Sequence, residues 1–142
     1  MTAFTLEATL DRPYPEAVEL VRTALSEQGF GVLTEIDLAA TLKAKLDVEV
    51  APEVILGACR PQLAHAALQA EPSIAAVLPC NVVVRSVDDT TTRVEAFDPA
   101  AMMGLADNPR LESIATEARE RITAALDSLD RADRSTDTTR RD

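Results

Sequence analysis

The sequence predicts an α+β fold, an antiparallel sheet of about five strands with helices on one face. Several short segments alternate apolar and polar residues or form compact apolar runs, which is typical of strands. Two of them, residues 81–87 and 91–97, are separated only by a turn at Asp88 and Asp89 and therefore form a hairpin. The predicted order is β-α-β-(α)-β-α-β-β-α, a β-α-β-β-β-β-α core with extra short helices.

The N-terminal segments predict a strand, a helix, a strand and a short helix. Residues 4–10 alternate apolar and polar side chains, as a half-buried strand does. Residues 15–28 carry apolar side chains at helical spacing, and Gly29 is a typical residue to follow a helix. Residues 30–37 predict a second strand, and residues 38–46 are rich in helix-forming residues.

The middle of the chain predicts two more strands joined by helical segments. Residues 53–59 form a compact apolar strand, and Pro61 begins a helix that reaches Ala70. Residues 73–78 add a helical turn or two before the hairpin strands.

The C-terminal part has the clearest helical pattern. Residues 98–109 predict a linker with a short helical piece, and Asn108 and Pro109 suit the start of a helix. The apolar positions of that helix are Leu111, Ile114, Ala115, Ala118, Ile122, Ala125, Leu126 and Leu129. We expect residues 1–129 to form one domain and residues 130–142, almost free of apolar side chains, to form a disordered polar tail.

Composition and charge disfavour several classes of partner. The chain of 142 residues has a formal net charge of -10, and such a surface repels phosphate backbones and anionic lipids. No apolar run approaches the roughly 20 residues of a membrane helix, and the N-terminus does not resemble a signal peptide. We therefore expect a cytoplasmic protein that binds neither nucleic acid nor membrane and keeps its two cysteines as thiols.

Four polar or thiol residues are predicted to meet near one end of the sheet. Cys59 ends one predicted strand and Cys80 begins another, and the helical segment between them can return the chain to the same end. Asp98 follows the last strand, and Asn81 is a polar residue in an otherwise apolar strand. Ordinary structural roles remain open for all four: the thiols as packing residues, Asn81 as an edge side chain and Asp98 as a helix cap.

Motifs for metal binding or common catalytic mechanisms are not found. The cysteines lack the short spacing of zinc or thioredoxin motifs, and His65, the single histidine, lies beside the apolar stripe of its helix. There is no glycine-rich phosphate loop and no nucleophile elbow. The sequence therefore assigns no metal, no cofactor and no catalytic residue, and it favours a non-enzymatic role.

Three long blocks of sequence carry a family resemblance: "GFGVLTEIDLAATLKAKL", "ILGACRPQLAHAALQAEPSIAAVLPCNVVV" and "AFDPAAMM". Over about residues 4–128 the chain resembles the domain-of-unknown-function family 302 of bacteria and archaea, although Arg60 stands where that family usually has Asn. The resemblance implies an α+β fold similar to that of the TATA-binding protein, without implying DNA binding, and a homodimer. It supplies no catalytic residues. The positions that match its signature are Gly57, Cys59, Pro61, Pro79, Cys80, Asn81, Asp98, Pro99, Met102 and Met103.

Three functions follow as hypotheses. The first is a non-enzymatic small-ligand-binding or regulatory module with a pocket between the sheet and the helices, near Cys59, Cys80, Asn81 and Asp98. The second is thiol chemistry, either redox sensing or a cysteine-dependent enzyme, at Cys80 or Cys59. The third is a structural homodimer with Met102 and Met103 at its interface.

Overall fold

A computed structural model describes the backbone of residues 3–140 and the side chains of residues 3–101 and 104–130. Five strands form one sheet in the order β1-β5-β4-β3-β2, and every neighbouring pair is antiparallel. The elements are β1 (Thr5–Leu10), α1 (Tyr14–Glu27), β2 (Gly31–Asp37), α2 (Leu38–Leu46), β3 (Glu53–Cys59), α3 (Pro61–Ala70), the 3-10 helix η1 (Pro72–Val77), β4 (Cys80–Asp88), β5 (Thr91–Phe97), α4 (Ala100–Ala106), the 3-10 helix η2 (Pro109–Leu111) and α5 (Glu112–Arg140). The predicted α+β class, its five strands and the hairpin are confirmed, whereas the likeness to the TATA-binding protein stays a prediction.

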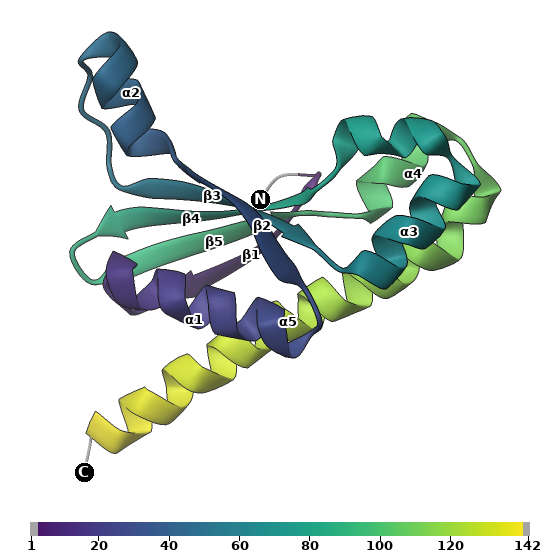
Figure 1. The fold of residues 1–142 in the computed structure, drawn as a ribbon. Helices are drawn as coiled ribbons and strands as arrows, with labels where there is room; N and C mark the ends of the chain where they lie inside the picture. Colours follow the sequence, from purple (N-terminus) through teal and green to yellow (C-terminus); the bar gives the residue numbers. More distant parts are fainter. Residues whose placement is uncertain (1–2, 141–142) are drawn as a thin grey trace.

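One face of the sheet packs on α1 and α5 (Figure 1). Alternate residues of the four strands β1, β5, β4 and β3 point to this face, and the fully buried ones include Leu10, Leu56, Val84 and Val94. Leu and Val side chains of this kind stabilise the fold by about 1.5–3 kcal/mol each relative to exposure. The buried Thr92 hydroxyl of the same face donates a hydrogen bond of 2.8 Å to the Arg12 carbonyl oxygen, so the core holds no unpaired hydroxyl there.

A second, smaller core lies at one end of the sheet. Ala67, Ile74 and Leu111 pack together there, so α3, η1 and η2 are held to the start of α5. Figure 1 shows α3 and α4 gathered at this end and α2 at the opposite end. Asn108 accepts a hydrogen bond from the Arg110 backbone N–H, which confirms it as the cap of the turn that leads into α5.

The last helix is the longest of the chain. The backbone of α5 continues through Arg140. The expectation that residues 130–142 form a disordered polar tail stays a prediction. Residues 141–142 lie outside the described range, and no described helix is long and apolar enough to cross a membrane.

The helix α2 has little packing of its own. Asp37 accepts a hydrogen bond from the Ala40 backbone N–H at its start, and Asp47 ends it with a positive φ of 55°. Lys43 forms ion pairs with Asp47 and Glu49, which closes the following turn. No residue of α2 is buried, so tertiary contacts contribute little to this helix.

Gly57 in β3 is the one glycine of the sheet where neighbouring side chains leave no room for a Cβ atom. A Cβ added at this position would lie 2.1 Å from Thr34 Oγ1 and 2.8 Å from Pro79 Cγ. Both distances are shorter than real Cβ atoms show, so a side chain at position 57 would force Thr34 or Pro79 to move. The groups that approach Gly57 are therefore these two side chains.

We predict that Gly57→Ala lowers the free energy of unfolding by about 1–3 kcal/mol, because the added methyl group overpacks this site. Gly104→Ala is the matched control, since a Cβ there meets nothing within 4 Å and alanine is favoured over glycine in a helix. Adding Thr34→Ala to Gly57→Ala should restore part of the loss. Urea unfolding of the variants measures this, and equal stability of Gly57→Ala and the wild type would contradict it.

Candidate functional site

The four residues singled out from the sequence lie near one end of the sheet but on different faces. Cys80 pairs with Ala58 and Asn81 pairs with Gly57 across β3 and β4. Successive side chains of a strand point to opposite faces, so Cys80 faces the helices and Asn81 faces the open side of the sheet. The structure therefore does not bring the four residues into one pocket.

The two cysteines share a small cavity on the helix side. Its volume is about 40 Å³, and its walls include Phe30, Leu63 and Ile114. A volume of this size has room for a water molecule or two and not for an organic ligand. Burial, and secondarily the neighbouring Cys59, raises the pKa of the Cys80 thiol from 9.0 to about 11. Because the thiolate is the nucleophile, Cys80 is poorly suited to thiol chemistry at neutral pH.

Asp98 has a structural role in the fold. Its Oδ1 atom accepts a hydrogen bond of 2.9 Å from the Ala100 backbone N–H and so caps the start of α4. The same carboxylate pairs with Arg119 Nε at 3.2 Å and ties α4 to α5. This is the capping role that the sequence left open as the alternative to ligand binding.

A larger cavity lies on the open face of the sheet, where β1 and β4 begin and β5 ends. Its volume is about 460 Å³, within the range of small-molecule sites. Three polar residues line it: Thr5, Asn81 and Glu95. The remaining walls are apolar and come from the sheet, from the segment before β4 and from α4: Phe4, Val77, Pro79, Val83, Phe97 and Leu105.

Asn81 supplies the uncommitted polar group of this cavity. Its side chain is exposed, and none of the described residues forms a hydrogen bond with it. An amide offers two donors and one acceptor, so Asn81 can position a ligand by either kind of bond.

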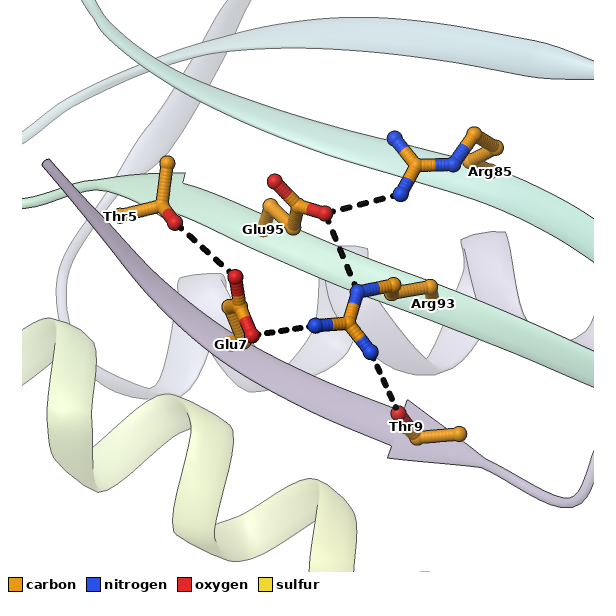
Figure 2. Close-up of polar contacts among 6 residues, drawn as sticks. All are labelled: Thr5, Glu7, Thr9, Arg85, Arg93 and Glu95. Atoms are coloured by element: carbon orange, nitrogen blue, oxygen red, sulfur yellow. Dashed lines mark hydrogen bonds and ion pairs between the residues drawn. The ribbon is translucent and has the colours of Figure 1, made fainter. Parts of the chain in front are cut away.

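Glu95 belongs to a network of charges that borders the cavity (Figure 2). Its Oε1 atom accepts hydrogen bonds from Arg85 Nη2 at 2.8 Å and from Arg93 Nε at 3.1 Å. Arg93 also pairs with Glu7 and donates to Thr9 Oγ1 at 3.3 Å. Two guanidinium groups and two carboxylates therefore balance one another on the open face.

The strand register explains the geometry of this network. Glu7 stands directly opposite Glu95, and Arg85 stands directly opposite Arg93. Like charges directly opposite destabilise a sheet, so the favourable contacts run diagonally and along β5 instead. The hydrogen bond from Arg85, together with the bond from Arg93, lowers the pKa of Glu95 against the opposing effect of burial.

Sequence reasoning found Asn81 but missed Glu95 and the cavity. The available signal was the run of polar residues at alternate positions of the strands, which marks the face away from the core. That signal does not show which strands are neighbours. Glu7 and Arg93 lie 86 residues apart, and only the pairing of β1 with β5 brings them together. The described residues contain no group of three or more His, Cys, Asp or Glu side chains placed to hold a metal.

We predict that the Cys80 thiol of the folded protein reacts with iodoacetamide about a hundredfold more slowly at pH 8 than the same thiol in urea. A rise of the thiol pKa from 9.0 to about 11 lowers the thiolate fraction at pH 8 by that factor. Peptide mapping of the alkylated protein resolves Cys80 from Cys59. Rapid alkylation of Cys80 in the folded protein at pH 8 would contradict this and support a reactive thiol.

The raised pKa of the Cys80 thiol also makes the stability of the fold depend on pH. The raised pKa means that folding favours the protonated thiol. The contribution of Cys80 to the free energy of unfolding is therefore complete below pH 9 and is lost as the pH rises to about 11. The difference in unfolding free energy between wild type and Cys80→Ala should fall by about 2 kcal/mol across that interval.

Comparison with known proteins places this geometry in a family. The family model described as domain of unknown function DUF302 matches residues 6–129. A crystal structure of an uncharacterised conserved DUF302 protein from Bacillus stearothermophilus superposes with a TM-score of 0.81 at 29% sequence identity, covering 89% of this chain and 98% of that chain. No curated protein matches. The chain belongs to the DUF302 family.

Proposed function

We propose that this protein is a non-enzymatic small-ligand-binding or regulatory module whose ligand occupies the cavity on the open face of the sheet. The observation that carries the proposal is a cavity of about 460 Å³ with mainly apolar walls and the uncommitted amide of Asn81 among its polar groups. Apolar walls with few placed polar groups are typical of small-molecule sites. Of the four residues predicted from the sequence, Asn81 alone is among the residues that line this cavity.

The chemistry of the lining favours binding over catalysis. Glu95 is the single titratable side chain among the described residues that line the cavity, and both its arginine contacts hold it ionised. A general base works best when its pKa lies near the operating pH, and the lowered pKa of Glu95 moves away from that condition. In the part of the chain that the structure describes, no cysteine, serine or histidine lines the cavity to act as a nucleophile.

We predict that a screen of small aromatic fragments by NMR yields binders that shift the methyl resonances of Val77 and Val83. Val83→Trp should abolish these shifts, because the indole fills the cavity from β4. Val87→Trp is the matched control, since Val87 lies farther along the same strand, is exposed and does not line the cavity. Fragments that bind wild type and Val83→Trp equally well would contradict the proposal.

A homodimer is the second candidate, and the segment around α2 favours it. Five large apolar side chains of residues 33–50, the α2 arm, are exposed: Leu33, Ile36, Leu46, Val48 and Val50. In Figure 1 α2 stands away from the helices that cover the sheet. Exposed apolar side chains concentrated in one segment often mark an interface, and a second copy of the chain could cover them. Met102 and Met103, suggested for the interface from the sequence, have side chains outside the described set.

We predict that light scattering at micromolar concentration reports a dimer and that Leu46→Glu combined with Val50→Glu converts it to a monomer. The added carboxylates would be buried without partners in an interface. Val87→Glu, an exposed apolar position outside the α2 arm, serves as the control and should stay dimeric. A monomeric wild type would remove this candidate.

Thiol chemistry remains a weaker alternative. Both cysteines are free thiols, but the raised pKa of Cys80 and the small cavity beside it argue against it. A cytoplasmic location stays a prediction that rests on the sequence.

A further inference from the structure

We propose that the ligand of the open-face cavity is an uncharged molecule with an apolar body and a hydrogen-bond donor, and that the donor meets the carboxylate of Glu95. This inference rests on the proposed binding function and goes further by naming the class of ligand. Two observations support it. Only one of the two carboxylate oxygens of Glu95 accepts hydrogen bonds from the arginines, and the charges of the surrounding network are balanced.

The two carboxylate oxygens of Glu95 have different partners. Oε1 accepts both the Arg85 and the Arg93 hydrogen bonds. Oε2 receives none from the described residues, and in Figure 2 the second oxygen points away from both guanidinium groups. Glu95 is also a lining residue of the cavity. An ionised carboxylate is acceptor-only, so a ligand group that meets the free oxygen must be a donor.

The charge of the network excludes an ionic ligand. Arg85 and Arg93 balance Glu7 and Glu95, so these four side chains leave no net charge to neutralise an ion, and Glu53, which stands opposite Arg85, does not line the cavity. An ammonium group would meet a carboxylate whose charge Arg85 and Arg93 already offset, and a carboxylate would face Glu95 itself. Either ion would also lose hydration against apolar walls without a full counter-charge, which is costly. A neutral N–H or O–H group meets the acceptor without this cost.

Four naphthalene probes of similar size separate the possibilities: 2-naphthol, 2-methoxynaphthalene, 2-naphthoate and 2-naphthylmethylammonium. At pH 7 these are a neutral donor, a neutral molecule without a donor, an anion and a cation. We expect 2-naphthol to bind the full-length protein about tenfold more tightly than each of the others, as measured by fluorescence titration and by NMR shifts at the cavity. A hydrogen bond to a charged acceptor accounts for a factor of this size.

The outcomes distinguish the inference from the proposed function. If 2-methoxynaphthalene binds as tightly as 2-naphthol, or if either ion binds most tightly, the ligand class is overturned while a binding cavity remains. If none of the four probes binds wild type more tightly than Val83→Trp, both the inference and the proposed function are overturned.

A double variant tests whether Glu95 is the residue that accepts the hydrogen bond from the ligand. Glu95→Gln combined with Arg85→Gln removes one charge of each sign, so the network stays balanced and the Arg93 pair with Glu7 is kept. The preference for 2-naphthol over 2-methoxynaphthalene should fall from about tenfold to below about threefold, because a neutral acceptor gives a weaker bond. Glu7→Gln is the control, since Glu7 belongs to the network but does not line the cavity, and it should keep the preference. An unchanged preference in the double variant with native circular dichroism would overturn the assignment.

Discussion

The packing of one sheet face on α1 and α5 is the interaction on which the rest of this structure depends. Side chains alternate along a strand, so burying one set commits the other set to the opposite face. In β5 the buried set includes Val94 and Ala96, and the intervening Arg93 and Glu95 must face away. A shift of one residue in register would place those charges in the core, which makes the register strongly specified.

The open face is stable because its charges compensate one another. The direct pairs of β5 with β1 and β4 carry like charges at Glu95 and Arg93, and diagonal contacts of Arg93 with Glu7 and of Arg85 with Glu95 offset this. The pairs are partly exposed, so each contributes modestly, about 0–1 kcal/mol. Their larger effect is local, because they fix the orientation of the Glu95 carboxylate at the border of an apolar cavity.

The corner formed by "GAC" and "PCN" has two sides with different roles. Toward the helices, Cys59 and Cys80 line a small cavity between the sheet and α3. Toward the open face, Gly57 leaves room for Pro79, and Pro79 and Asn81 line the larger cavity. One residue along β4 therefore separates the wall of the small cavity from the wall of the larger one. This explains why residues adjacent in the sequence need not belong to one site.

The sequence by itself determined the elements, because each depends on local periodicity: the alternation of residues 4–10, the helical stripe from Leu111 to Leu129 and the turn at Asp88 and Asp89. It also pointed to Asn81 as an unusual polar residue. Only the tertiary structure decided that β1 pairs with β5 and that α4 and the segment before β4 wall the cavity. These contacts join residues far apart in the chain, and local patterns carry no information about which strands become neighbours.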